Sequence, residues 1–560
     1  MRISNVTLEL PATTEAGRAR AQVLAQAATI EGKPTSIVTY QSSGRLAIIG
    51  EEAAALAAAR RLGGVPSTLM VPGDASPEPS KADGFVIVRG GQPEVDGRLG
   101  RFTINLSSGE DTVSLAEASG AATPHFDLVL DLCDPPLLQH EVPPVGYYAG
   151  GRSEAALERA LAEIPEMRGE FEKPKYFNYD PSICAHGGSG LTGCTRCIDA
   201  CPTIAITSIG DKVSVDPYLC QGAGSCVAAC PSGAMSYAFP AVNDLLAYLK
   251  SLLGDFAAAG GHDPVLMVHD AWSRKALEET LGPAMPENIV PFEVEEVGSL
   301  GLETWLAALA YGARAVVVTV TASAPRRMAD ELRAQAGFAR PLLEAMGYAA
   351  DSLLVLDSAA AAKDPAGWWR GLPEKALCKP AKFVCPDDKR GILRLVIEHL
   401  YRHAPAPHKV AELPAGAPFG EIRVDKDTCT LCMGCVSVCP TAALNAGGDL
   451  PQLKFTEWNC VQCGLCEKAC PEDAITLKPR FLFDAESRQQ PRLLNEEQPF
   501  CCISCGKPFG TRSMIDNMLK KLEGHWMFQD EDARRRLQMC DHCRVKDMFK
   551  SGRPGGPTAP

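Results

Sequence analysis

Short apolar runs separated by turn residues dominate residues 1–172. These runs predict strands at 46–49, 85–88, 102–106 and 126–132. An alanine-rich segment at about 51–62 predicts a helix directly after the first strand. We expect an α/β domain over this whole region, because strands and helical patterns share it.

A second region of alternating elements covers residues 241–370. Its apolar runs predict strands at 265–268, 315–321 and 353–356, and its 3.6-residue patterns predict helices at 273–281, 302–311 and 324–346. This order predicts a second α/β domain with a parallel sheet. Proline-containing residues 371–418 are predicted to be a linker, polar residues 481–499 another linker, and residues 551–560 a tail.

The bulk composition fits a chain of several folded domains. The 560 residues allow about three to five domains, and an apolar content of 46% allows sizeable cores. No apolar run approaches the roughly 20 residues that cross a bilayer, and the N-terminus lacks a signal-peptide pattern. We therefore expect a cytoplasmic protein without a membrane span. The net charge of −13 argues against nucleic acid as the main partner.

The cysteines change this picture, because there are 23 of them and they are clustered. Residues 173–240 hold seven and residues 419–480 hold eight, mostly in CxxC groups. Tight CxxC groups in a chain without an export signal favour metal sites over disulfides. Thiolates are soft ligands that suit iron–sulfur clusters and zinc.

Residues 419–480 contain the run C-x2-C-x2-C-x3-C-P twice. The first run is Cys429, Cys432, Cys435 and Cys439, and the second is Cys460, Cys463, Cys466 and Cys470. The segment resembles the bacterial two-cluster ferredoxins, in which the fourth cysteine of each run ligates the other cluster. The resemblance implies one [4Fe–4S] cluster on Cys429, Cys432, Cys435 and Cys470, and another on Cys460, Cys463, Cys466 and Cys439. A pair of zinc sites is the alternative.

Residues 173–240 form an altered copy of the same module. A Cys-Pro-x-x-Ala-apolar repeat begins at Cys201, Cys230, Cys439 and Cys470. A small residue at the alanine position allows close backbone packing against a cluster. In the first run Leu191 replaces the leading cysteine, and we expect upstream Cys184 to take its place, with His186 as the alternative ligand. One cluster would use Cys184, Cys194, Cys197 and Cys230.

The second run of this module lacks its middle cysteine, because Ala223 stands there. This departure resembles the seven-iron ferredoxins, which hold a [3Fe–4S] cluster. The remaining ligands would be Cys201, Cys220 and Cys226. Three readings stay open: three irons, four irons with one non-cysteine ligand, or an empty site. Both modules are therefore expected to have the small βαββαβ ferredoxin-like fold.

The C-terminal unit, residues 481–550, contains the pairs Cys502/Cys505 and Cys540/Cys543. Such knuckles resemble zinc ribbons and treble-clef folds, and four thiolates make a closed structural zinc site. An iron–sulfur cluster or no metal are the alternatives. Cys501 and His542 are interpreted as bystanders, Cys378 and Cys385 as unpaired thiols, and Cys133 as a core residue.

Two weaker resemblances concern the α/β regions. Residues 262–357 resemble the small iron–sulfur delta subunits of hydrogenase and heterodisulfide reductase complexes in element order, but they contain no cysteine. The turn after residue 49 has the outline of a dinucleotide-binding turn, with Gly50, Glu52 and Ala55 at the three glycine positions. Glu52 would place a carboxylate where a pyrophosphate should lie.

The whole chain resembles a family of uncharacterised bacterial 4Fe–4S binding proteins, often encoded beside formate dehydrogenase and its accessory proteins. The cysteine runs at 429–471 and the segment 502–511 carry this resemblance. It implies formate dehydrogenase or its accessory proteins as partners. We expect an electron-transfer protein that relays single electrons between redox partners, without catalytic residues of its own. An assembly factor of a metalloenzyme, or a redox enzyme subunit with a flavin or open-iron site, are the alternatives.

Overall fold

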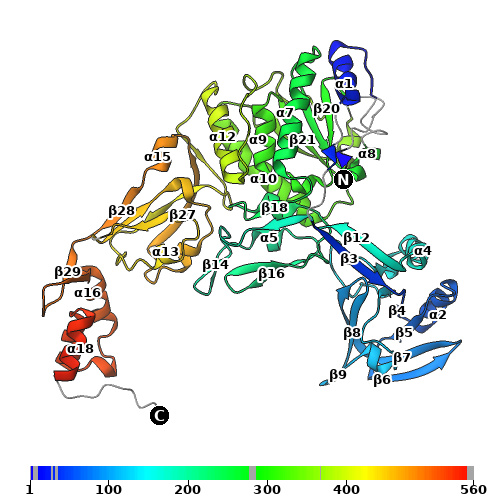
Figure 1. The fold of residues 1–560 in the computed structure, drawn as a ribbon, viewed down its shortest axis with the longest axis horizontal. Coiled ribbons are helices and arrows are strands. Elements are labelled where there is room, and N and C mark those ends of the chain that lie inside the picture. The colour runs from blue at the N-terminus through cyan, green and yellow to red at the C-terminus, as the bar shows by residue number, and fades with distance from the viewer. Residues whose placement is uncertain are drawn as a thin grey trace.

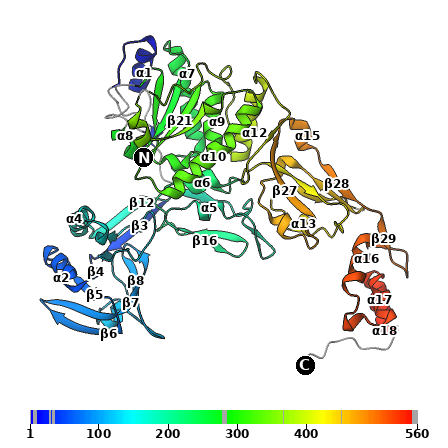
Figure 2. The same cartoon turned by 180° about the vertical axis from the view of Figure 1, so that it is seen from behind.

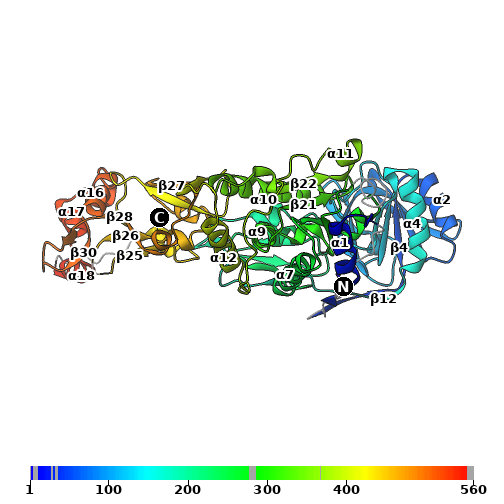
Figure 3. The same ribbon diagram turned by 90° about the horizontal axis from the view of Figure 1, so that it is seen from above.

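The computed structural model describes residues 2–3, 10–26, 30–31, 36–276, 285–365, 367–448 and 450–550. The molecule is elongated, with the N-terminal α/β domain at one end and the C-terminal unit at the other (Figure 1, Figure 3). The middle α/β domain and the two cysteine-rich modules lie between these ends, as the reverse view also shows (Figure 2). No helix in the described part of the chain has the length and apolar character needed to cross a membrane.

The N-terminal domain is built on an eight-stranded mixed sheet. Its parallel strands, in spatial order, are β11 (Tyr147–Ala149), β10 (Leu128–Asp131), β4 (Leu46–Ile49), β5 (Ser67–Val71) and β7 (Phe85–Arg98). Antiparallel β6 (Gly73–Ala82), β8 (Arg101–Ser108) and β9 (Asp111–Ser114) extend it, and α2 (Glu52–Arg61) and α4 (Glu154–Glu163) belong to the same domain. Leu46 and Ile48 enter one core while Ala47 and Ile49 enter the other, which explains the continuous apolar run of β4.

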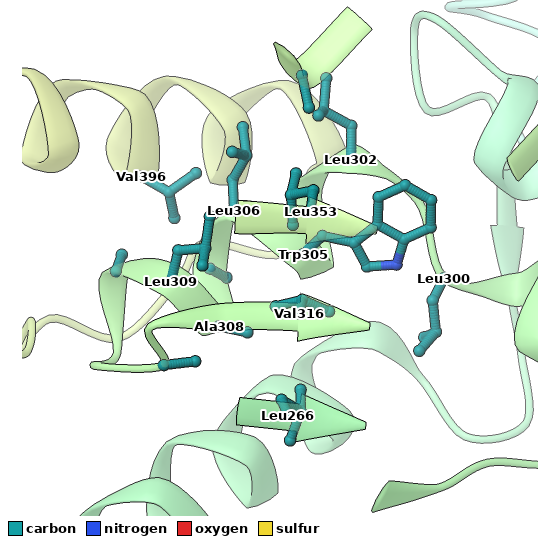
Figure 4. Packing of buried hydrophobic residues seen from close by; sticks show 14 of the residues in the cluster. Leu266, Leu300, Leu302, Trp305, Leu306, Ala308, Leu309, Val316, Leu353 and Val396 are labelled. Carbon is teal, nitrogen blue, oxygen red and sulfur yellow. The ribbon is translucent and has the colours of Figure 1, made fainter. Parts of the chain in front are cut away.

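The middle domain confirms the predicted parallel sheet. Its four parallel strands, in spatial order, are β20 (Ile289–Glu293), β19 (Val265–His269), β21 (Ala315–Val320) and β22 (Leu353–Asp357). Its main helices are α7 (Val242–Ala258), α9 (Leu302–Ala310) and α10 (Arg326–Ala345). Trp305 on α9 is 1% exposed, and it lies in one core with Leu306 and Val316 (Figure 4). Strand β20 was not predicted, and part of the predicted helix 273–281 lies outside the described residues, after α8 (Ala271–Ala276).

An early helix belongs to this middle core rather than to the N-terminal domain. Helix α1 (Glu15–Gln26) packs against α7, with Ala19 and Val23 in the shared core. Buried Arg20 donates hydrogen bonds to the carbonyls of Ile289 (3.2 Å) and Pro11 (2.6 Å). Strand β3 (Ile37–Ser42), which precedes β4 in the chain, pairs antiparallel with β12 (Gly169–Pro174) in a separate two-stranded sheet.

The two segments interpreted as linkers are instead regular structure. Residues 371–418 contain α12 (Lys389–Arg402), which packs against α9 with its apolar face in the middle core. Its buried apolar positions are Ile392, Leu393, Val396, Ile397 and Leu400. Residues 481–499 contain α15 (Ala485–Gln489) and β28 (Arg492–Glu496), which pairs with β26 of the second module. Proline-rich flanks around α12 and the polar composition of an edge strand led to the linker predictions.

Each cysteine-rich module has the element order β-α-β-β-α-β. The first contains β13 (Phe177–Tyr179), α5 (Arg196–Asp199), β16 (Ile206–Ile209), β17 (Lys212–Val215), α6 (Ser225–Ala229) and β18 (Met235–Tyr237). The second contains β24 (Gly420–Val424), α13 (Gly434–Ser437), β25 (Leu444–Ala446), β26 (Gln452–Phe455), α14 (Leu465–Lys468) and β27 (Ile475–Leu482). In both, the first and last strands pair antiparallel, and the two middle strands form a hairpin. A small hairpin, β14 (Gly187–Gly188) and β15 (Leu191–Thr192), is inserted in the first module.

The C-terminal unit consists of a hairpin and three helices. Its elements are β29 (Pro499–Cys501), β30 (Pro508–Thr511), α16 (Arg512–Lys521), α17 (Glu531–Leu537) and α18 (Asp541–Lys550). The Thr511 hydroxyl donates to the Thr430 carbonyl (2.9 Å), and Lys521 pairs with Glu472 (2.9 Å). These contacts join the unit to the two cysteine loops at one end of the second module.

Candidate metal centres

One cavity in the second module brings together Cys429, Cys432, Cys435 and Cys470. Burial, followed by the neighbouring thiols of the other three cysteines, raises the pKa of Cys435 to about 12. Burial and neighbouring thiols disfavour free thiolates, whereas a cationic metal core stabilises the thiolates that bind it. The residues therefore fit a four-thiolate cluster, and the fourth ligand comes from the other run of the sequence.

A second cavity in the same module is lined by Cys439, Cys460, Cys463 and Cys466. Burial, followed by the thiols of Cys460, Cys463 and Cys439, raises the pKa of Cys466 well above its usual value. Cys435 contributes further to this rise, so the two thiol groups of the module are neighbours. The crossed arrangement implied by the ferredoxin resemblance is thus the arrangement that the fold brings together.

Left-handed backbone turns allow three cysteines of one short loop to face one cavity. Leu431 and Met433 have φ of 54° and 61°, and Gln462 and Gly464 repeat this in the second run at 54° and 81°. The loops therefore curl around the space that they enclose.

The Cys-Pro-x-x-Ala repeat is also a repeat of backbone geometry. The residue before the alanine has a positive φ in all four copies, at Ile204 (53°), Gly233 (83°), Ala442 (51°) and Asp473 (49°). The alanines that follow are 2–3% exposed: Ala205, Ala234, Ala443 and Ala474. The turn directs each small side chain inward beside the cysteines, as expected for close packing against a bulky group.

The first module gathers Cys184, Cys194, Cys197 and Cys230. Burial, followed by the thiols of Cys230, Cys194 and Cys184, raises the pKa of Cys197 far above its usual value. Cys184 therefore lies where the missing leading cysteine of the run would be. The inserted hairpin β14–β15 spans the gap between Cys184 and Cys194.

His186, the alternative ligand, has both ring nitrogens engaged elsewhere. Nδ1 lies 2.8 Å from the Cys194 carbonyl oxygen and Nε2 lies 2.7 Å from the Ser208 hydroxyl. The ring is 2% exposed and bridges the inserted loop to strand β16. His186 therefore positions the backbone of Cys194, and its nitrogens are not directed at the thiols.

The Ala223 site is a cavity with three cysteines, Cys201, Cys220 and Cys226. Among the described residues that line it, none adds a fourth cysteine, a histidine or a carboxylate. Thr203 has its hydroxyl 3.3 Å from the Cys201 thiol, whereas the Ser225 hydroxyl donates to the Ala200 carbonyl (2.6 Å). The protein therefore offers three thiolates and leaves the fourth corner without a strong ligand.

Two cations, half-buried Lys173 and buried Arg390, contact the backbone of cysteine ligands, and sequence reasoning missed both. Lys173 donates to the Cys220 carbonyl (2.6 Å), and burial lowers its pKa to about 8. Arg390 on α12 donates to the Cys460 carbonyl (3.1 Å) and is 8% exposed. Both lie far from any cysteine motif in the sequence, so no spacing signal could have found them. Each places positive charge beside a thiol-rich site.

The two modules meet at their thiol groups. Burial raises the pKa of Cys194 to about 11, and the thiol of Cys463 in the second module contributes to that rise. Next to Cys194, an added Cβ on Gly193 would lie 2.6 Å from Leu465 Cγ. Lys468 of α14 also donates to the Thr192 carbonyl (2.7 Å). The Cys194 and Cys463 groups therefore face each other across a close module contact.

The C-terminal unit brings Cys502, Cys505, Cys540 and Cys543 together, with their sulfur atoms all within 4.8 Å of one another. Burial alone would raise the pKa of Cys502, but backbone amides of Cys540, Ser504 and Cys505 outweigh it and lower the pKa to about 6. The unit combines a knuckle beside a hairpin with a second pair at the start of α18. This group fits a single four-thiolate metal ion, and its geometry alone does not name the metal.

The remaining cysteines lie apart from these groups. Cys385 is buried with its thiol 3.2 Å from the Tyr311 hydroxyl, and Cys378 packs against the same core. Cys133 packs against the core of the N-terminal domain, and Cys501 is exposed. None of the four lines a cavity with the ligand cysteines.

The turn that resembles a dinucleotide-binding loop is filled by the protein itself. An added Cβ on Gly50 would lie 2.8 Å from Leu132 Cβ, and the Glu52 carboxylate accepts from Arg89 Nε (2.7 Å). The close approach at Gly50 therefore serves packing against Leu132, directly after β10, and the carboxylate of Glu52 is paired within the protein.

Comparison with known proteins agrees with this geometry. A family model described as a 4Fe-4S dicluster domain matches residues 177–231 and, separately, residues 421–471. The chain carries two 4Fe–4S dicluster domains. The matches cover both cysteine-rich modules, including the one with Ala223. No curated protein matches the chain. The expected link to formate dehydrogenase has no support in these comparisons and stays a prediction.

Replacing Cys435 with alanine should empty or shrink one cluster site. We expect anaerobically purified Cys435→Ala to contain between about one and about four fewer irons per chain than the parent, since a complete cubane holds four. Elemental iron and sulfide analysis measures this. The control is Cys133→Ala, which removes a cysteine outside the sites. Equal iron content in both variants would contradict the assignment.

The C-terminal thiols give a separate prediction. Cys505→Ser should lose the metal of this unit, whereas the neighbouring Cys501→Ser should keep it, because only Cys505 belongs to the four-sulfur group. Zinc and iron analysis identifies the metal, and limited proteolysis reports the order of α16–α18. If both variants keep the parent's metal content, the group does not bind a metal.

Proposed function

We propose that this protein is an intramolecular electron relay, which accepts single electrons from one protein and delivers them to another. The observation that carries the proposal is the junction of the modules, where the loop of Cys194 packs against the helix that follows Cys463 through Gly193 and Leu465, and Lys468 donates to the Thr192 carbonyl. A chain that only stored clusters, or used them to stiffen its fold, would not need two thiol groups to meet at the module contact. The iron–sulfur modules by themselves support electron transfer with protein partners.

The thiol groups follow one another in a fixed order along the molecule. Cys197 and Cys226 belong to one packed cluster in the first module, and Cys435 and Cys466 belong to another in the second. Between them, the loop of Cys194 meets the helix after Cys463 at the contact of Gly193 with Leu465. [4Fe–4S] clusters bound by these cysteines would exchange single electrons, with potentials tuned by hydrogen bonds, burial and nearby charge. The amide of Gln462, which donates to the Cys460 sulfur (3.3 Å), is one such hydrogen bond.

The end of this series in the first module is the three-cysteine site. We propose that it holds a [3Fe–4S] cluster, because Cys201, Cys220 and Cys226 line the cavity together with Ala223, which stands in place of the middle cysteine of the run. The Ala223 backbone packs closely against Gly298 of the middle domain, because an added Cβ on Gly298 would lie 2.3 Å from the Ala223 carbonyl oxygen. The loop is therefore fixed by the middle domain.

For the C-terminal unit we propose a structural zinc ion. Its four thiols are already gathered, and the knuckle beside a hairpin with a second pair at a helix start is typical of zinc sites. The unit abuts the loop of Cys429 through Thr430 and Thr511. Zinc would thus hold a cover over the outer end of the second module.

The module junction gives the test of the relay. Gly193→Val should push Leu465 away and slow electron equilibration between the modules, while iron content and the stability of each module are kept. Freeze-quench electron paramagnetic resonance after sub-stoichiometric reduction measures how electrons distribute over time. The control is Gly337→Ala, at a helical glycine with nothing within 4 Å of an added Cβ. Equal equilibration in both variants, with clusters intact, would contradict the relay.

A further inference from the structure

A cavity of about 310 Å³ lies between the first module, the middle domain and the start of α12. Its volume is at the lower end of small-molecule sites, which occupy about 300–1,000 Å³. Apolar side chains form most of its wall, including Ile183, Val227, Met235, Leu245, Leu300 and Ile392. A lining of this kind suits an organic ring.

Two charged groups with little exposed surface, Glu303 and Lys389, lie among the apolar side chains of the wall. Glu303 is 3% exposed, and its Oε2 accepts no hydrogen bond from any residue that the structure describes. The nearest cation is Lys389 Nζ, 3.4 Å away. Glu303 and Lys389 therefore form a long ion pair, and a ligand N–H in the cavity can give Oε2 the hydrogen bond that it lacks.

The Lys389 ammonium engages one of its three N–H groups only in this long ion pair with Glu303, so a ligand can take that N–H over. The ammonium donates to the carbonyls of Val227 and Ala228, both at 2.8 Å. The cavity therefore presents an acceptor, Glu303, next to a donor, Lys389. A ring with a carbonyl beside an N–H satisfies both at once, because Lys389 donates to the carbonyl and Glu303 accepts from the N–H.

The outer wall adds a charge preference. Asp180, Asp387 and Asp388 also line the cavity, and all three are exposed. Such carboxylates repel a phosphate group near the opening. The ligand that fits is therefore uncharged at its exposed end, rather than a nucleotide.

We propose that this cavity binds a flat, uncharged heterocycle with a carbonyl–N–H edge, of which the isoalloxazine ring of riboflavin is the representative. Such a ring would lie beside the first module's thiols, because Ser232 lines the cavity 3.7 Å from the Cys230 sulfur. Tyr179 also lines it and packs against the buried cluster that contains Cys184. This proposed binding site does not depend on the relay function, so each can be tested without the other.

Riboflavin binding to the whole, cluster-loaded chain tests the proposal, by equilibrium dialysis in the dark. Binding should weaken about ten- to hundredfold in Glu303→Gln, the loss expected for one hydrogen bond to a charged group. It should be lost in Val242→Trp, which fills the cavity. Glu331→Gln, a half-buried carboxylate on α10 outside the cavity, should bind as the parent does.

The ligand class is tested with two further probes. Flavin mononucleotide should bind more weakly than riboflavin, because its phosphate meets the three aspartates. Menadione, which has carbonyls but no N–H, should bind weakly and should not respond to Glu303→Gln. No riboflavin binding, or binding that both cavity variants leave unchanged, overturns the site. Menadione binding as tight as riboflavin overturns the carbonyl–N–H class.

Discussion

The close approach of Gly193 to Leu465 sets where the two cysteine-rich modules stand, and the rest of the arrangement depends on it. Because residue 193 has no side chain, α14 can rest against the loop that carries Cys194, and Lys468 closes the contact on the Thr192 carbonyl. A larger residue would force two rigid modules apart, since the wall on the other side is a packed side chain. The absence of a side chain at residue 193 therefore allows the thiol groups of the two modules to form one continuous series instead of two separate pairs.

Burial is the second constraint, and it acts on the thiols and cations together. Clustered thiols in the interior carry raised pKa values, as Cys435 shows, so the sites favour a bound metal core over free thiolates. Lys173 and Arg390 bring positive charge to the backbone of Cys220 and Cys460, where it would stabilise the negative charge of a ligated cluster. The middle domain, through α12, therefore contributes to the modules as well as supporting them.

The sequence alone predicted the groups of cysteine ligands better than it predicted how the domains pack. The C-x2-C-x2-C-x3-C-P runs, with their crossed pairing, are short-range signals, and the fold gathers the residues that they indicate. The role of α12 was missed because its apolar face lies between proline-rich flanks. The pairing of Glu303 with Lys389, and the contact of Gly193 with Leu465, join residues far apart in the chain. No local pattern encodes such contacts, which follow from how domains pack.

The electron paramagnetic resonance spectrum of the fully reduced, anaerobically prepared chain tests the central claim most directly. It is compared with the sum of spectra from two variants, each with the ligand cysteines of one module replaced. Neighbouring clusters at the junction would interact magnetically, so the account predicts that the spectrum of the whole chain differs from that sum. A spectrum equal to the sum would show that the modules are magnetically isolated, and it would contradict a single relay through the chain.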